Sequence, residues 1–396
     1  MSQIALELLA ALVKSVIIIA GLLGAFAYLT LIERRVLARF QRRVGPNRLG
    51  PFGLLQPIAD ALKMVFKEQI IPTQAKTVVF LLAPTISIFV AITAFGVVPL
   101  GDKFGSLPSY WQPALTDINI GVLYILAMSS LAVYGIVLGG WSSGNKYSLL
   151  GALRSAAQMV SYEVSIAISL SGVIMLAGTL SMIGIVHQQS SQHIWFILAQ
   201  PLGFVLYGIA ALAEVNRAPF DLPEAEQELT AGYLTEYSGL RWSLYQMSEY
   251  INMITTSSVL TTLYFGGWTF FGLENIPGLS ILIFIVKVAF FLFIFMWLRA
   301  TLPRIRYDML MKLGWQVLMP LSVLNLLVTA YIVAFQQPWW IAGVFGLITL
   351  LIAGYAAASK IHPKKANVVT EGVALPTSVR LVKVESTPSP ETAAIS

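Results

Sequence analysis

The chain has 396 residues, of which 57% are hydrophobic and only 11% are charged. Because a soluble domain carries about 25% charged residues, this composition excludes an ordinary soluble protein and predicts a membrane protein. The net charge of +6 comes from basic residues beside hydrophobic segments, which favours membrane topology signals over nucleic-acid binding. With no cysteine, the chain has no disulfides or thiolate-bound clusters, and the spacing of its three histidines predicts no metal site.

Nine hydrophobic segments come close to the roughly 20 apolar residues that a membrane crossing needs. They are residues 4–32, 77–100, 119–140, 157–186, 194–213, 250–271, 279–298, 315–336 and 339–358. Since lipid cannot satisfy backbone polar groups, we expect each segment to be helical. The sequence therefore predicts an all-α transmembrane bundle of about 8–9 spans. We expect this domain to cover residues 1–358 and a disordered cytoplasmic tail to cover residues 359–396.

The loop after the first segment contains a short amphipathic helix. One face of this helix is apolar and the other is polar, with Asp60 and Lys63 on the polar side. The apolar face consists of Leu55, Ile58, Ala59, Leu62, Val65 and Phe66. This pattern is typical of a helix that lies in the plane of the membrane interface.

Lys and Arg residues are concentrated in alternate loops. Loops 33–76 and 299–314 and the start of the tail hold most of them, and nine spans place these regions on one side of the membrane. Basic loops face the cytoplasm, so we expect the N-terminus outside and the C-terminus in the cytoplasm.

The loop at residues 214–249 is acidic, although it falls on the cation-rich side. It contains seven acidic residues and only two arginines. The acids are Glu214, Asp221, Glu224, Glu226, Glu228, Glu236 and Glu249. The segment is either a solvated or partner-bound acidic loop, or a row of proton-accepting groups folded back toward the bilayer.

Three carboxylates are expected at a similar depth near the inner membrane face. Glu163 lies just inside the fourth segment, Glu214 follows the fifth and Glu249 precedes the sixth. Close, partly desolvated carboxylates have raised and coupled pKa values, which suits them to hold and pass protons. The alternative is that they are interfacial acids paired with nearby arginines. Lys287 lies within the seventh segment, where a cation is usually functional or paired.

Several motifs, in order along the chain, resemble a known family. The most distinctive are Arg154-Ser-Ala-Ala-Gln-Met-Val-Ser-Tyr-Glu163 and Glu214-Val-Asn-Arg-Ala-Pro-Phe-Asp-Leu-Pro-Glu-Ala-Glu-Gln-Glu228. Glu33-Arg34-Arg35, the stretch from Gln41 to Lys63 and Glu249-Tyr250 complete the set. Together they closely resemble a family of membrane subunits of NADH–quinone oxidoreductase (respiratory complex I), whose mitochondrial equivalent is subunit 1. The resemblance covers about residues 1–336.

The resemblance implies a bacterial plasma-membrane subunit that forms the membrane side of a ubiquinone or menaquinone chamber and couples quinone reduction to proton translocation. NAD, FMN and iron–sulfur clusters would belong to partner subunits of the redox arm, and antiporter-like subunits would adjoin it in the membrane. Glu163, Glu214 and Glu249 would be proton-path acids, and Glu224, Glu226 and Glu228 would form an acidic loop beside the chamber. Arg34, Asp60, Arg217, Phe220 and Arg299 would be chamber and loop residues.

Two other functions remain open from the sequence. One is the equivalent subunit of a membrane-bound hydrogenase-type complex, which reduces no quinone. The other is a passive membrane anchor for the redox arm. Carboxylates at the spans and Lys287 argue against an anchor, because an anchor has no reason to bear their desolvation cost.

Overall fold

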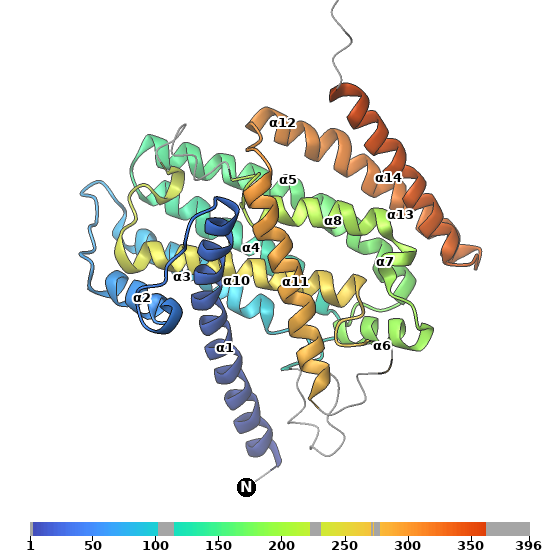
Figure 1. Cartoon of the computed structure of the whole chain (residues 1–396), viewed down its shortest axis with the longest axis horizontal. Coiled ribbons are helices and arrows are strands. Elements are labelled where there is room, and N and C mark those ends of the chain that lie inside the picture. The colour runs from blue at the N-terminus through green and yellow to red at the C-terminus, as the bar shows by residue number, and fades with distance from the viewer. Residues whose placement is uncertain (1–2, 102–114, 222–230, 271, 273–277, 362–396) are drawn as a thin grey trace, which may run out of the picture. The chain divides into compact units, whose positions relative to one another are not determined.

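The computed structural model describes residues 3–101, 115–221, 231–270, 272 and 278–361, and within these residues it is helical without β-strands (Figure 1). This confirms the predicted all-α class. The long helices are α1 (Gln3–Phe40), α3 (Thr77–Phe95), α4 (Gly121–Ser142), α5 (Lys146–Ala177), α10 (Gly239–Tyr264), α11 (Leu279–Thr301), α13 (Met319–Ala334) and α14 (Trp340–Ile361). The shorter ones are η1 (Pro51–Gly53), α2 (Gln56–Phe66), α6 (Met182–Gln192), α7 (Phe196–Ala199), α8 (Pro201–Glu214), η3 (Gly232–Leu234), α12 (Tyr307–Lys312) and η5 (Leu313–Leu318).

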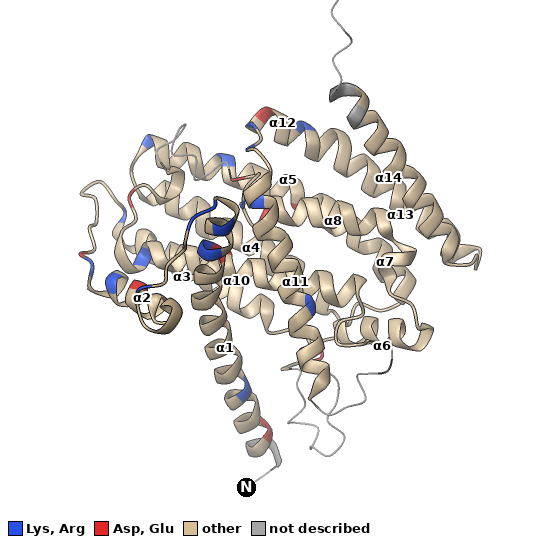
Figure 2. Ribbon diagram, viewed as in Figure 1, with Lys and Arg blue, Asp and Glu red and all other residues tan. Residues whose placement is uncertain are grey.

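Six helices in the described part of the chain are long and apolar enough to cross a membrane. They are Leu6–Phe40, Thr77–Phe95, Gly121–Ser142, Lys146–Ala177, Leu279–Thr301 and Tyr307–Ala334. Two shorter apolar helices, Pro201–Glu214 and Trp340–Ala356, accompany them. Figure 2 shows that charged residues are sparse along these helices and gather toward loops and helix ends. The arrangement is that of a multi-pass membrane protein.

The helix boundaries differ from the predicted segments where a backbone feature interrupts the apolar sequence. The segment predicted at 157–186 ends as α5 at Ala177, because Gly178 adopts a left-handed conformation (φ 68°) and caps the helix. Ser181 then caps the start of α6 by accepting a hydrogen bond from the Gly184 amide. Pro201 separates α7 from α8 within the segment predicted at 194–213.

Helix α10 is a central helix with a polar composition. It packs against α1, α2, α3, α8 and α11 (Figure 1), and nearly every residue from Ser248 to Tyr264 is buried. Hydroxyl groups such as those of Thr255 and Thr261 donate to carbonyls one turn earlier in the same helix. These bonds satisfy the hydroxyls without outside partners, which lets a Ser/Thr-rich helix lie inside the bundle.

Small residues allow the neighbouring helices to approach closely. A Cβ atom at Gly135 of α4 would lie 2.1 Å from the Ser87 Oγ of α3, and one at Gly151 of α5 would lie 2.6 Å from the Cα of Gly232. Small-residue contacts of this kind are typical of helix packing in membranes. The close packing fixes α3, α4 and α5 around the carboxylates described below.

The chain divides into two compact units, residues 1–350 and residues 351–396. All residues considered below belong to the first unit. The predicted domain boundary at residues 358 and 359 stays a prediction, and most of the predicted tail lies outside the described residues.

Candidate functional site

The structure brings Glu163, Glu214 and Glu249 together from three helices. The carboxylate of Glu163 on α5 accepts a hydrogen bond from Ser130 of α4, and it interacts electrostatically with Glu214 at the end of α8. Glu214 and Glu249 line the same small cavity. Helices α5, α8 and α10 therefore hold the three acids in one connected group.

The cavity between Glu214 and Glu249 has both polar and apolar walls. It has a volume of about 20 Å³, enough for about one water molecule, and Ser248 and Asn252 also line it. A second cavity of about 50 Å³ adjoins it, because Glu214 and Asn252 line both. Tyr207 and the hydroxyl-bearing residues Thr255 and Thr256 continue the second cavity along α8 and α10. The rest of the second cavity is mostly apolar, so its polar groups form one continuous side along which water molecules would relay protons between carboxylates.

Glu249 is linked to an arginine outside this cavity. Its carboxylate is buried and accepts a hydrogen bond of 3.1 Å from the Tyr233 hydroxyl. Glu249 also interacts electrostatically with Arg217, which follows α8 in a buried loop. Arg217 is therefore connected to the acid group through Glu249.

A buried ion cluster joins Arg217 to α1 and α11. The carboxylate of Glu33 on α1 pairs with Arg217 at 3.4 Å and with Arg299 of α11. Burial alone would lower the pKa of the Arg217 guanidinium, but Tyr250, Glu33 and Glu249 raise it above its ordinary value, so Arg217 stays cationic.

The Arg217 cluster is incompletely hydrogen-bonded. The Nε and Nη2 atoms of Arg217 and the Oε2 atom of Glu33 are buried and have no hydrogen-bond partner among the described residues. Such atoms are costly to leave unpaired. The Tyr250 side chain also interacts with both Glu33 and Arg217.

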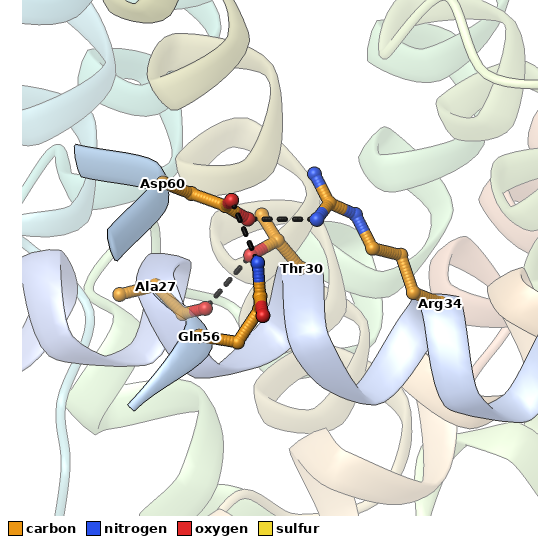
Figure 3. A network of polar contacts seen from close by, with 5 residues as sticks. All are labelled: Ala27, Thr30, Arg34, Gln56 and Asp60. Carbon is orange, nitrogen blue, oxygen red and sulfur yellow. Dashed lines mark hydrogen bonds and ion pairs between the residues drawn. The ribbon is translucent and has the colours of Figure 1, made fainter. Parts of the chain in front are cut away.

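A separate cavity of about 150 Å³ lies between α1, α2 and α10. Arg34 pairs with Asp60 at 2.7 Å at its edge, and Gln56 donates to Asp60 at 2.9 Å (Figure 3). The rest of the wall is mostly apolar and aromatic and includes Phe26, Pro57, Met64, Trp242 and Tyr250. This combination of apolar walls and a few placed polar groups is typical of small-molecule sites.

Tyr250 connects this cavity to the buried ions. It lines the cavity, and its ring centroid lies 4.1 Å from the guanidinium carbon of Arg217. A guanidinium over an aromatic ring is an attractive cation–π contact. One side chain therefore contacts both the cavity beside Asp60 and the arginine that faces Glu249.

The remaining candidate residues are placed differently. Phe220 is a buried core residue, with its carbonyl accepting from Gln158 and its ring 6.1 Å from that of Tyr162. Arg217, Arg299 and Phe220 line none of the cavities above, so their assignment to a chamber stays a prediction. Glu224, Glu226 and Glu228 lie outside the described residues.

The contacts of Lys287 are typical of a residue that stabilises the fold. Its Nζ atom donates to the carbonyls of Phe265 at 2.7 Å, Gly267 at 3.0 Å and Thr269 at 2.7 Å. It also lies 4.9 Å from the centroid of the Trp195 ring. These contacts hold the loop after α10 against α11, and a role for Lys287 in proton transfer stays untested.

The predicted amphipathic helix is confirmed as α2. Its apolar residues Leu55, Ile58, Leu62, Val65 and Phe66 are all exposed in the isolated chain. Pro57 is its buried residue, packed toward the cavity beside Asp60.

Comparison with known proteins identifies the family. The family model described as NADH dehydrogenase matches residues 13–330. The chain belongs to this family. Similar proteins include a subunit of the NADH-quinone oxidoreductase of Deinococcus deserti, which is 53% identical over 87% of this chain and 90% of its own length. Subunit 8 of the Thermus thermophilus enzyme is 52% identical over 82% of this chain and 87% of its own length.

The similarity extends beyond bacteria. NADH-ubiquinone oxidoreductase chain 1 of Chondrus crispus is 51% identical over 80% of this chain and 94% of its own length. The chain is therefore a membrane subunit of an NADH–quinone oxidoreductase, an oxidoreductase complex whose other subunits are its partners. This confirms the family that the sequence motifs indicated.

Proposed function

We propose that this subunit forms the membrane side of the quinone chamber and couples quinone reduction to proton translocation. The observation that carries the proposal is the position of Tyr250, which lines the cavity beside Asp60 and also contacts Arg217. The subunit would lie in a bacterial plasma membrane with its basic loops and its C-terminus in the cytoplasm.

The cavity between α1, α2 and α10 fits a quinone. A quinone has a flat apolar ring with carbonyl acceptors, which suits walls formed by Phe26, Trp242 and Tyr250 and a donor such as Arg34. Reduction of the quinone takes up electrons from a partner subunit and an equal number of protons. The electron carriers NAD, FMN and iron–sulfur clusters would all be in those partners.

A quinone that has taken up electrons but not yet its protons is anionic, and the buried ions would transmit this change of charge. A change of charge beside Arg34 and Asp60 acts on Tyr250 and so on the position of Arg217. Because Arg217 interacts with both Glu33 and Glu249, a shift toward Glu33 would weaken its stabilisation of the Glu249 carboxylate. Glu249 would then take up a proton more readily.

The three acids would pass protons through the polar cavities. Glu249 and Glu214 share the cavity that has room for about one water molecule, and Glu214 is electrostatically coupled to Glu163. Protons would therefore move within one coupled group on the way to antiporter-like partner subunits.

Neutral substitutions in the assembled complex test the proposal. We expect Glu249→Gln and Glu163→Gln to lower the number of protons pumped per electron in sealed vesicles. Glu236→Gln is the matched control, because Glu236 accepts a hydrogen bond from Asn145 and lines neither polar cavity. Wild-type pumping stoichiometry in both test variants, with normal assembly, would contradict the proposal.

A further inference from the structure

The largest cavity described in the structure is a groove at the C-terminal end of α1, separate from the site above. It has a volume of about 840 Å³ and is formed by the end of α1, the loop at residues 41–53 and α11. None of its lining residues lines the cavity beside Asp60. Figure 2 shows basic residues gathered at this end of α1 and in the following loop.

Three arginines line the groove, and no acidic residue does. These are Arg35, Arg39 and Arg43. Within the described part of the chain, Arg39 and Arg43 have no ion-pair partner, and the side chain of Arg43 donates to that of Gln41. The groove therefore concentrates uncompensated positive charge.

Arg35 is held in place by the loop. Its Nε atom donates to the Pro46 carbonyl at 3.3 Å, and a Cβ atom at Gly45 would lie 3.0 Å from its Cα atom. Its Nη2 atom is buried and lacks a hydrogen-bond partner among the described residues. Because this guanidinium is already held in place, binding an anion would cost it little further conformational entropy. The anion would also supply a hydrogen-bond partner for the buried nitrogen.

The apolar part of the groove lies on membrane-spanning helices. Ile32 on α1 and Phe293 on α11 are exposed on helices that are long and apolar enough to cross a membrane. Nearer the arginines, Phe52 is 83% exposed and has φ 53°, a conformation that residues other than glycine rarely adopt and that is often found at functional sites. Along α1, the apolar Ile32 lies closer to the middle of the span than Arg35 and Arg39.

We propose that this groove binds an anionic phospholipid. The headgroup phosphate contacts the three arginines, and the upper acyl chains lie against Ile32 and Phe293. A phospholipid joins an anion to hydrocarbon in the same order as the groove does, whereas a free anion would leave the apolar wall uncovered. Anionic lipids are attracted to basic segments beside a membrane helix on the cytoplasmic side.

Photo-crosslinking in the intact complex tests the proposal. The complex is reconstituted in phosphatidylcholine vesicles with a trace of photoactivatable phosphatidylglycerol, and labelled peptides are mapped. We expect labelling within residues 32–52 that unlabelled phosphatidylglycerol abolishes and extra phosphatidylcholine does not. The Arg39→Gln/Arg43→Gln variant should weaken the apparent affinity about 30-fold.

A matched variant separates this site from general electrostatics. Arg42→Gln/Arg48→Gln removes the same amount of charge from the loop that follows α1, but neither residue lines the groove. It should label like the wild type, with native gels confirming equal assembly of both variants. Equal loss in both variants, or equal competition by phosphatidylcholine, would overturn the proposal. So would a photoreactive residue at position 43 that captures another subunit in place of lipid.

Discussion

The ring of Tyr250 lies 4.1 Å from the guanidinium carbon of Arg217 and at the same time lines the cavity beside Arg34 and Asp60. This is the described contact through which a charge change in the cavity would reach the buried ions. The ring and the hydroxyl of Tyr250 contribute differently, since the cation–π contact needs the ring alone.

Two substitutions separate these contributions. We expect Tyr250→Leu to lower quinone reductase activity about 5- to 30-fold, because it removes a desolvated cation–π contact. Tyr250→Phe keeps the ring and should retain more of the activity. NADH oxidation with quinone is measured against oxidation with a soluble acceptor that bypasses the membrane subunits. Equal losses in both variants would show that the hydroxyl group is the important element.

Removing the charge of Glu33 should strongly destabilise the ion cluster that it forms with Arg217 and Arg299. Glu33→Gln removes the carboxylate that forms an ion pair with the buried Arg217, and breaking a buried pair costs about 3–5 kcal/mol. We expect reduced assembly and a lower unfolding temperature of the complex. Glu33→Gln/Arg217→Gln removes both members of the buried pair and should recover part of the loss. A double variant less stable than the single one would contradict this account.

Part of this architecture is predictable from the sequence. Long apolar segments indicate the membrane-spanning helices, and an amphipathic pattern indicates α2. The predicted positions of Glu163 and Glu249 near helix ends are wrong, because α5 begins at Lys146 and α10 at Gly239, and only Glu214 ends its helix. Glu33 does not stand out as a site residue, because the first apolar segment ends at residue 32. The helix continues to Phe40 because the next residues are good helix formers without Gly or Pro.

Other features depend on contacts that local patterns do not encode. The partners of Glu33 are 184 and 266 residues away in the sequence, so no spacing rule connects them. The partners of Lys287 are backbone carbonyls, which any residue type supplies. The sequence indicates that a cation in a span needs a partner, but the fold decides which one.

Asn252 offers a test of the polar cavities. It lines both the cavity between Glu214 and Glu249 and the adjoining one. We expect Asn252→Leu to fill this junction with hydrocarbon and to slow proton transfer about 10-fold or more, because an apolar site does not hold relay water. Asn252→Ser keeps the junction polar and should pump at near the wild-type rate. Vesicle acidification driven by NADH measures both variants.

Lys287 should contribute mainly to stability. Lys287→Met removes three charge-assisted hydrogen bonds to the loop after α10, which should cost about 2 kcal/mol or more. We expect a lower unfolding temperature and an unchanged number of protons pumped per electron. A stable Lys287→Met complex with reduced pumping would instead place Lys287 in the proton path.

Asp60 should affect quinone binding more than stability. The Arg34–Asp60 pair is partly exposed, with side chains 54% and 34% accessible, and such pairs contribute about 0–1 kcal/mol to folding. Asp60→Asn would remove the ion pair with Arg34 and weaken the hydrogen bond from Gln56. The polar groups at the edge of the cavity would therefore change position. We therefore expect a higher KM for quinone with little change in unfolding temperature. Lys63→Gln changes a neighbouring charge on α2 that lies outside the cavity lining and serves as the control. A loss of assembly in Asp60→Asn, with KM unchanged, would show that the pair is structural.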